Sequence, residues 1–247
     1  MEEVRQDKLG ASVVLLAELA PWSEVVATRP WPPPPAGGTS TTARQLDEAD
    51  DAAFGPSRPF APSQAINDKV SLWRGDITRL AVDAIVNAAR PSLLGGGGID
   101  KAIHRVAGPG LLEECRPLGG CLHGQCKVTG AHGLPCRLVL HTVGPNRDLH
   151  SEAEGYPLLH AAYRSCLARV VEHDVRSVAL SCVSTGAYRF PSRPAAHVAL
   201  STVRKWLEHG DNMEKVERII FATFLEQDEA IYTELMYKFY FPPPTSS

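Results

Sequence analysis

The sequence has no long hydrophobic run and no recognisable export signal. Its longest apolar stretch, Ala11–Pro21, is interrupted by a charge and is far shorter than the roughly 20 residues that cross a bilayer. Glu2 and Glu3 occupy the place of a basic n-region, which argues against a secretory signal and disfavours a mitochondrial presequence. Arg5 and Lys8 leave the mitochondrial alternative open. We therefore expect an intracellular protein, cytoplasmic or nuclear, with no membrane partner.

The chain also lacks a large excess of charge of either sign. Its 247 residues include 25 Lys and Arg against 28 Asp and Glu, which gives a formal net charge of −3. Proteins that bind nucleic acid usually present a broad basic surface, and this chain has a slight excess of acidic residues. We therefore expect no direct nucleic-acid partner. The 6 cysteines are too few for a disulfide framework in a chain of this length, and this favours a reducing compartment.

Familiar metal and catalytic motifs are missing as well. Cys115, Cys121, His123 and Cys126 lie near one another, but they lack the paired C-x2-C spacing that is typical of zinc sites. No Walker loop, no G-x-G-x-x-G fingerprint and no G-x-S-x-G elbow occurs. The sequence therefore predicts no metal site and none of these nucleotide-binding or hydrolase motifs.

Two parts of the chain differ in composition. Residues 1–64 contain a Pro-rich run, Pro30–Pro35, followed by Gly, Ser, Thr and acidic residues, and only residues 11–28 have an apolar pattern that suits a short helix. We predict a poorly ordered N-terminal extension at 1–64 and one folded domain at 65–243. The extension is either a linker or a docking peptide for a proline-binding groove.

The pattern of the folded part alternates between buried strands and amphipathic helices. The expected strands are 69–73, 84–87, 137–142, 177–183 and 216–224, and the expected helices are 100–107, 158–172, 194–208 and 229–239. Such alternation predicts an α/β fold, a sheet covered by helices on both faces. In these folds ligands bind at the carboxyl ends of the strands.

A run of glycines, Gly95–Gly98, follows one expected strand and precedes a helix. Glycine allows backbone amides to approach a phosphate closely at a helix N-terminus, although a flexible connector would have the same composition. Asp100 and His104 then share one helical face. Asp100 is either a catalytic or ribose-binding carboxylate or a helix cap, and His104 is either a base or a structural partner.

Two other loops follow expected strands. Ser184–Pro191 contains hydroxyl groups, a glycine and Tyr188, and together with the glycine run it would flank one crevice that suits a diphosphate. Asp76, in Gly75-Asp76-Ile77-Thr78, follows the first strand. Its carboxylate would accept from an adenine amine or would cap a turn.

Taken together, these segments resemble the macrodomain family, and within it the MacroD-type branch. The similarity runs from about residue 66 to residue 240 and leaves residues 1–64 outside. The matching stretches are Gly75–Thr78, Val82–Ala89, Leu93–Asp100, Ile103–Arg105, Ala107–Pro109, His141–Pro145 and Ser184–Pro191.

The resemblance implies a three-layer α/β/α sandwich with a mixed, mostly parallel sheet. It further implies that the protein binds ADP-ribose, removes mono-ADP-ribose from acidic side chains of proteins, and deacetylates O-acetyl-ADP-ribose, without a cofactor or a metal. Mono-ADP-ribosylated proteins would be its partners, and the size of the domain permits a monomer. A reader that binds ADP-ribose without cutting it is the alternative.

The resemblance also assigns roles to residues. Asp76 and Ile77 would hold the adenine, Phe224 would stack on its ring, and the two loops would clamp the diphosphate. Asn87 and Asp100 would position the distal ribose, with His104 supporting Asp100. The catalytic set implied is Asp100, Asn87 and His104. The ligand-binding set implied is Asp76, Ile77, Thr78, Asn87, Ala89, Arg90, Gly95, Gly96, Gly97, Gly98, Ile99, Asp100, Ser184, Thr185, Gly186, Ala187, Tyr188, Arg189 and Phe224.

Two positions depart from the pattern of the branch. Arg90 stands where Asn-Ala-Ala-Asn would place its last asparagine, and Arg189 stands where a glycine is usual. Arg90 would either bond a ribose hydroxyl or phosphate or pair with Asp100. If residue 189 needs a positive φ, arginine is strained there. Both departures bear more on turnover than on binding.

Overall fold

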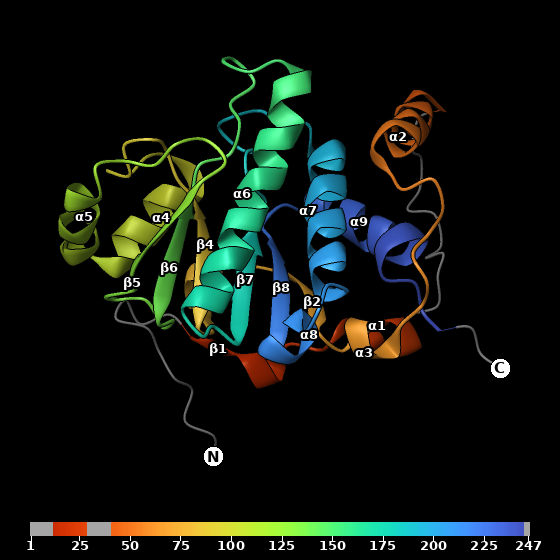
Figure 1. Cartoon of the computed structure of the whole chain (residues 1–247), viewed down its shortest axis with the longest axis horizontal. Coiled ribbons are helices and arrows are strands. Elements are labelled where there is room, and N and C mark those ends of the chain that lie inside the picture. Colours follow the sequence, from red (N-terminus) through yellow and green to blue (C-terminus); the bar gives the residue numbers. More distant parts are fainter. Residues whose placement is uncertain (1–11, 29–40, 245–247) are drawn as a thin grey trace.

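The central sheet has six strands, in the order β2-β8-β7-β4-β6-β5, in a computed structural model that describes residues 12–28 and 41–244 (Figure 1). All neighbours pair in parallel except β5, which runs antiparallel to β6 at one edge. The prediction of a mixed, mostly parallel sheet is confirmed. The strands of this sheet are β2 Val70–Arg74, β4 Ala84–Ala88, β5 Cys126–Gly130, β6 Leu138–Thr142, β7 Ser177–Ser181 and β8 Arg218–Thr223.

The inner strands are apolar on both sides because helices cover both faces of the sheet. Within β4, Ala84 and Val86 belong to the hydrophobic core on one face, whereas Ile85 belongs to the core on the other. All three side chains are fully buried. This explains why the sequence shows a continuous apolar run here rather than an alternation of polar and apolar residues.

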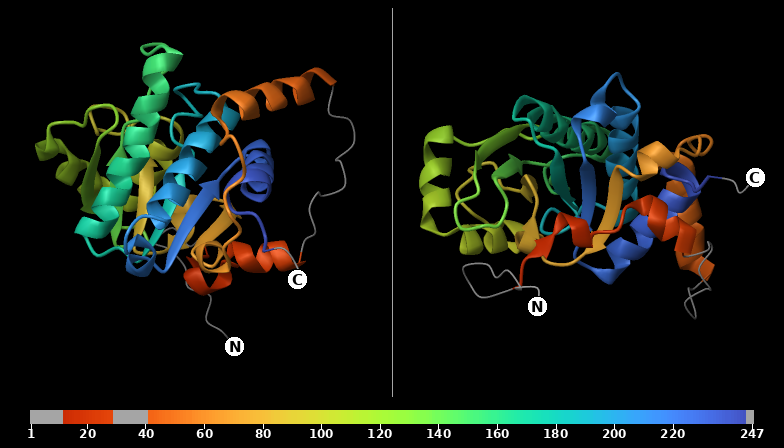
Figure 2. Two further views of the ribbon diagram at one scale, coloured as in Figure 1. Left: turned by 45° about the vertical axis from the view of Figure 1, so that its right-hand side comes forward. Right: turned by 90° about the horizontal axis from the view of Figure 1, so that it is seen from below.

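Helices α6 and α7 pack together over one face of the sheet, and α4 and α5 pack on the other, so that the molecule has three layers (Figures 1 and 2). Helix α9 packs against β2 and β8. The helices are α1 Trp22–Thr28, α2 Thr41–Phe54, α3 Gln64–Asn67, α4 Gly98–Ala107, α5 Pro109–Cys115, α6 Glu152–Glu172, α7 Ser192–Leu207, α8 Asn212–Lys215 and α9 Glu226–Leu235. Short helical turns lie at Leu16–Glu18, Ile77–Arg79, Arg116–Leu118 and Met236–Tyr240.

Helix α6 begins earlier than the apolar pattern predicted, at Glu152 rather than Leu158. The Ser151 side chain donates to Oε2 of Glu154 (2.8 Å), and the same oxygen accepts from the Ser151 main-chain N–H (3.0 Å). These contacts cap the first turn of the helix. Pro157 lies inside the helix, so the proline does not mark its beginning.

The first described segment differs from the expected short helix at 11–28. Residues Val14–Leu15 form strand β1, which pairs in parallel with β3, Leu80–Ala81, and only Trp22–Thr28 are α-helical. Trp22 is almost completely buried, and its Nε1 donates to the Phe241 carbonyl (2.9 Å). A large aromatic side chain therefore fixes this segment to the folded domain.

Within the N-terminal extension, Thr41–Phe54 form helix α2, which packs on the domain. Helix α2 packs against α7, where Asp51 accepts two hydrogen bonds from Arg193 (2.7 and 2.9 Å). The run Pro30–Pro35, expected to be either a linker or a docking peptide, lies outside the described residues. Within 12–28 and 41–244, no helix is long and apolar enough to cross a membrane.

Candidate functional site

A pocket of about 300 Å³ lies where β4, β7 and β8 end. Parallel neighbours place their carboxyl ends at one edge of the sheet, so the loops that follow these strands meet there. The lining residues are Ala88, Ala89, Arg90, Gly96, Gly97, Gly98, Ile99, Asp100, Gly144, Ser181, Cys182, Val183, Ser184, Thr185, Gly186, Ala187, Tyr188, Ala222, Phe224, Leu225 and Asp228.

Most of the site residues predicted from the sequence are among these. The pocket brings together Ala89, Arg90, Gly96–Asp100, Ser184–Tyr188 and Phe224. The predicted residues that do not line it are Asp76, Ile77, Thr78, Asn87, Gly95, His104 and Arg189. The two glycine-bearing loops therefore flank one crevice, as the sequence predicted.

The loop before α4 takes backbone conformations that glycine permits. Gly95 and Gly98 have φ of +78° and +56°, and Gly97 is the residue that precedes the helix. Within the described part of the chain, the main-chain N–H groups of Gly96–Ile99 find no acceptor. Free amides at a helix N-terminus attract an anion, because the helix dipole adds to their partial positive charge.

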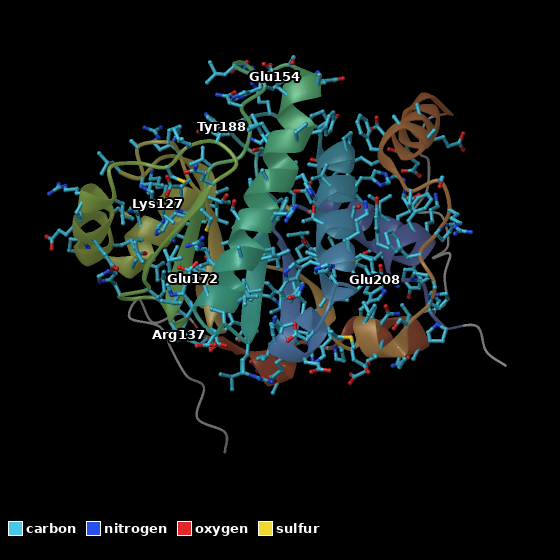
Figure 3. The ribbon with its side chains drawn as sticks, in the orientation of Figure 1. Lys127, Arg137, Glu154, Glu172, Tyr188 and Glu208 are labelled. Carbon is cyan, nitrogen blue, oxygen red and sulfur yellow. The ribbon has the colours of Figure 1, made fainter. Side chains whose placement is uncertain are left out.

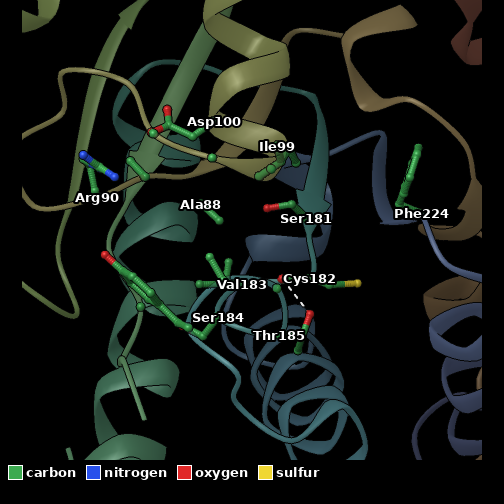
Figure 4. A pocket seen from close by; sticks show the side chains of 18 of the residues that line it. Ala88, Arg90, Ile99, Asp100, Ser181, Cys182, Val183, Ser184, Thr185 and Phe224 are labelled. Carbon is green, nitrogen blue, oxygen red and sulfur yellow. Dashed lines mark hydrogen bonds between the residues drawn. The ribbon is translucent and has the colours of Figure 1, made fainter. Parts of the chain in front are cut away.

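The loop after β7 presents a second set of amides. It closes on itself through bonds from the Arg189 N–H to the Gly186 carbonyl (2.9 Å) and from the Phe190 N–H to the Ser184 carbonyl (3.0 Å). Thr185 Oγ1 donates to the Cys182 carbonyl (3.1 Å; Figure 4). The N–H groups of Ser184–Tyr188 are left without an acceptor among the residues that the structure describes.

Gly144 packs directly behind this second loop. A Cβ built on Gly144 would lie 2.2 Å from Oγ of Ser184 and 2.5 Å from Cγ1 of Val183. The side chains of Val183 and Ser184 therefore leave room only for a glycine at position 144. Tyr188 lies at the same end of the molecule as the start of α6, below Glu154 in Figure 3. Its main-chain carbonyl accepts from the Arg147 N–H (3.1 Å), which ties the loop at 144–150 to the pocket.

Asp100 lies in the first turn of α4 and is only 2% exposed. Its Oδ1 accepts from Nδ2 of Asn87 (2.8 Å) and lies 3.4 Å from Nε2 of His104. Its Oδ2 is buried and has no hydrogen-bond partner within the described residues. Asn87 is fully buried behind the pocket, and we find that it holds the carboxylate from the side of the sheet.

His141 extends this hydrogen-bonded chain into the sheet. Nδ2 of Asn87 lies 3.1 Å from Nδ1 of His141, and Nε2 of His141 lies 2.9 Å from Oγ1 of Thr129. Burial, followed by the charge of His104, lowers the pKa of His141 to about 3, so the ring is neutral. The sequence analysis missed this role, although a histidine inside the apolar strand 138–142 was the available signal.

Asp76 caps a turn. Its Oδ1 accepts from the main-chain N–H of Thr78 (3.0 Å) and from Oγ1 of Thr78 (2.7 Å), while Ile77 and Thr78 are both buried. The structural alternative for Asp76 is therefore present, and its adenine-binding role stays a prediction. Phe224 is 72% exposed and lies at the end of the pocket opposite Arg90 and Asp100 (Figure 4).

Of the two arginines that depart from the branch pattern, Arg90 lines the pocket and Arg189 does not. Arg90 does not pair with Asp100, since no ion pair joins these two described residues. Arg189 has a φ of +53°, so the position does require a left-handed backbone, and its guanidinium contacts Asp148. Neither point could be decided from the sequence alone.

Several lining residues were not predicted, among them Cys182 and Asp228. Burial raises the pKa of Cys182 to about 12, so its thiol remains protonated at neutral pH and is no nucleophile. Burial also raises the pKa of Asp228, which lies in the first turn of α9. No local motif distinguishes these residues, because both sit in ordinary apolar or acidic surroundings in the sequence.

Comparisons with known proteins agree with this geometry. Residues 86–199 match the family model described as "Macro domain". The chain is 51% identical over 177 residues to human "ADP-ribose glycohydrolase MACROD2", covering 72% of this chain and 41% of that protein. It is 49% identical over 165 residues to a macro domain-containing protein of Chlorobaculum tepidum, covering 66% of this chain and 92% of the relative. The chain thus spans only about two fifths of the human relative.

Solved structures show the same similarity. A Trypanosoma brucei macrodomain in complex with ADP-ribose superposes with a TM-score of 0.66 at 37% identity, covering 81% of this chain and 92% of that one. The macro domain of ganglioside induced differentiation associated protein 2 gives a TM-score of 0.74 at 28% identity, covering 95% and 98%. The three-layer fold predicted from the resemblance is confirmed.

Proposed function

This chain belongs to the macro domain family, and we propose that it binds ADP-ribose in the pocket and hydrolyses the bond between one ADP-ribose unit and an acidic side chain of a protein. O-acetyl-ADP-ribose is a second proposed substrate, because it carries the same kind of ester. The pocket is formed by one chain, so we propose that a monomer suffices. The observation that carries the proposal is the buried, unpaired Oδ2 of Asp100 beside two sets of free amides.

The amides account for the binding of a diphosphate by a protein with a net negative charge. Gly96–Ile99 offers N–H donors on one side of the pocket, and Ser184–Tyr188 offers them on the other. Hydrogen bonds from such donors to a phosphate are charge-assisted and do not need a basic surface. A ligand with two phosphates therefore fits the arrangement.

The two ends of the pocket give the ligand its direction. Phe224 offers an exposed ring at one end, where it would stack on the adenine. Asn87 and Asp100 stand at the other end, where the distal ribose would place its C1″ atom. His104 would support the Asp100 carboxylate from the next turn of α4.

The proposed reaction is attack of water on C1″. Oδ1 of Asp100 is held by Asn87, which leaves Oδ2 to orient the water. Asp100 or the bound diphosphate accepts the proton of the water, the C1″–O bond breaks, and the carboxylate of the protein leaves with the bonding electron pair. Positioning of the water supplies much of the rate gain.

The test measures release of ADP-ribose from a mono-modified glutamate peptide. We expect Asp100→Ala to lower kcat by at least about 100-fold, because the water loses its acceptor, while the Kd for free ADP-ribose changes only a few-fold. Asp68→Ala, at an exposed aspartate outside the pocket, is the control. Equal turnover by wild type and Asp100→Ala would remove Asp100 from the mechanism.

A reader without hydrolase activity is the second candidate, and the arginines at positions 90 and 189 favour it. Arg90 adds a permanently charged side chain to the lining of the pocket, and Arg189 adds one on the surface directly after Tyr188. Calorimetric titration of free ADP-ribose beside the turnover assay separates the two candidates. Binding without turnover by the wild-type chain supports the reader, and turnover supports the hydrolase.

A further inference from the structure

Arg90 is a cation that faces the pocket without a partner. Its side chain is exposed, it lines the pocket, and it forms no hydrogen bond or ion pair with any described residue. An arginine presents five N–H donors in a fixed plane and stays protonated at every physiological pH. A permanent charge with no protein acceptor is available to an anion that enters the site.

The position of Arg90 points to the reacting end of the ligand. A Cβ built on Gly96 would lie 2.9 Å from Oδ2 of Asp100 and 3.1 Å from Nε of Arg90. Both side chains therefore converge on one glycine. Figure 4 shows Arg90 and Asp100 at the same end of the pocket and Phe224 at the other.

Asp100 does not neutralise Arg90, although it is close. Its Oδ1 is already bound by Asn87, and its carboxylate is buried in the first turn of α4, where the helix N-terminus stabilises the negative charge. Among the described residues, no hydrogen bond joins Oδ2 of Asp100 to Arg90, although both lie beside Gly96. This separation keeps the base and the cation available for different groups of the substrate.

We propose that Arg90 binds the carboxylate that leaves when the ADP-ribosyl ester is hydrolysed, and that it thereby selects acyl-linked substrates. The proposal rests on the proposed function. Water attacks C1″, the C1″–O bond breaks, and the bonding pair goes to the departing carboxylate, whose two oxygens face the guanidinium fork. The proton of the water goes to Asp100 or to the diphosphate, and then to solvent.

The chemistry of arginine explains the selectivity. A guanidinium stabilises negative charge that develops on a leaving carboxylate, by charge-assisted and often bidentate hydrogen bonds. A guanidinium holds its proton too tightly to act as a general acid. A serine-linked ADP-ribose must leave as an alkoxide or be protonated, and Arg90 cannot supply that proton. Arg90 is therefore a specificity determinant for acidic linkages.

The experiment measures single-turnover hydrolysis of a series of acyl-ADP-ribose esters whose parent carboxylic acids differ in pKa. We compare wild type with Arg90→Ala, Arg90→Lys and Arg90→Asn. Arg90→Ala is expected to slow the acetyl ester by about tenfold or more, to leave the Kd for free ADP-ribose within about threefold, and to make the rate depend more steeply on the acidity of the leaving group. Arg90→Lys, which keeps the charge, is expected to restore part of the rate.

Arg105→Ala is the matched control, because Arg105 is exposed on α4 and does not line the pocket. An unchanged melting temperature of Arg90→Ala confirms that it folds. Equal rates and equal slopes for wild type and Arg90→Ala overturn the proposal. A loss of ADP-ribose affinity that matches the loss of rate also overturns it, since Arg90 would then bind the diphosphate. If the wild type hydrolyses no ester at all, the proposed function itself fails.

Discussion

Each side of the pocket is built from one short stretch of the sequence, whereas helix α2 is held by residues that are far from it in the sequence. Asn87 and Asp100, which meet at the end of the pocket where we propose the reaction, are 13 positions apart. Asp51 of α2 meets Arg193 across 142 positions and His197 across 146. Each side of the pocket therefore follows from one loop, whereas the place of α2 depends on side chains that only the completed fold brings together.

The two regions also differ in the groups that they use. Arg193 is only 4% exposed and donates to Asp51 and to Glu234 (3.0 Å), so buried opposite charges hold α2. The pocket offers mainly neutral amides, with one free cation of the described residues at its reacting end. Ion pairs fix a geometry because losing one partner leaves a charge unsatisfied. Amides attract an anion without filling the site with a competing counter-charge.

Aromatic rings connect the two regions. The ring centroids of Phe54, the last residue of α2, and Tyr156 are 4.3 Å apart. The ring centroids of Tyr156 and Phe190 are 5.0 Å apart. Phe190 follows the second loop of the pocket directly. Helix α2 therefore supports the outer end of that loop through Tyr156 without entering the pocket.

The largest effect that we expect from this comparison is on stability. Asp51→Asn removes one partner of the buried Arg193 and is expected to lower the free energy of unfolding by about 3 kcal/mol. Glu234 still faces Arg193, which limits the loss. Chemical denaturation measures the change. The kcat of hydrolysis at 25 °C should stay within about twofold, because Asp51 does not line the pocket.

Asp47→Asn is the matched control on the same helix. Asp47 is 3.8 Å from Nε of Arg193 and about half exposed, so its loss should cost less than about 0.5 kcal/mol. Equal losses for Asp47→Asn and Asp51→Asn would show that the pair with Asp51 does not hold α2. A parallel fall in kcat for Asp51→Asn would show that the two regions are not separate.

Lowering the pH should remove the contribution of the Asp51 carboxylate to the free energy of unfolding of the wild type. Burial raises the pKa of Asp51, but hydrogen bonds from His197 and Arg193 outweigh it and bring the pKa to about 2, below the ordinary 3.8. A lowered pKa adds stability that is present above about pH 4 and is lost as the pH falls towards 2. Unfolding curves of wild type and Asp51→Asn from pH 5 to pH 2 test this. The difference between them should shrink by about 1–2 kcal/mol.

The opposite pH dependence of the stability difference between wild type and Asp51→Asn would contradict this prediction. A difference that grows as the pH falls would require an Asp51 pKa above 3.8 in the fold, and the ion pair with Arg193 would then not stabilise α2. Arg193 itself stays protonated throughout, since its hydrogen bonds to Asp51 and Glu234 raise its pKa against the effect of burial.

The same comparison explains what the sequence could predict. The buried strands at 84–88, 138–142 and 177–181 are apolar runs next to glycine-bearing loops, so local composition indicated both the sheet and the pocket. The docking of α2 was not predictable, because no local feature of Asp51 shows that Arg193 will face it. Strand β5 was also missed, since it is an edge strand with mostly half-buried side chains.

Within the site, residue types were easier to predict than their partners. The glycine run and Asp100 follow a local pattern, and the resemblance added Asn87 and Phe224. The contact between His141 and Asn87 joins two adjacent strands, β6 and β4, and depends on their register. A single sequence does not fix the register between these two strands, whose residues Asn87 and His141 are 54 positions apart in the chain.

The smallest effect that we expect, on stability and on ADP-ribose binding, comes from substituting Arg189. This residue combines a surface ion pair with a place directly after the amides of Ser184–Tyr188. Arg189 adopts a φ of +53° and pairs with Asp148 on the surface, where both side chains are more than half exposed. Arg189→Gly relieves the left-handed backbone and loses an ion pair that solvent screens. We expect the melting temperature to rise by about 1–2 °C and the Kd for ADP-ribose to change less than about twofold.

Asp148→Ala separates the two causes, because it removes the ion pair and leaves the backbone of residue 189 unchanged. Calorimetric titration and thermal melting of both variants should show the gain in stability for Arg189→Gly alone. If Asp148→Ala instead weakens ADP-ribose binding several-fold, ligand binding by the pocket depends on a surface ion pair. The pocket would then resemble α2, whose docking depends on a buried ion pair. The amides of Ser184–Tyr188 would then need the Arg189–Asp148 pair to hold them in place, and the contrast between the two regions would be lost.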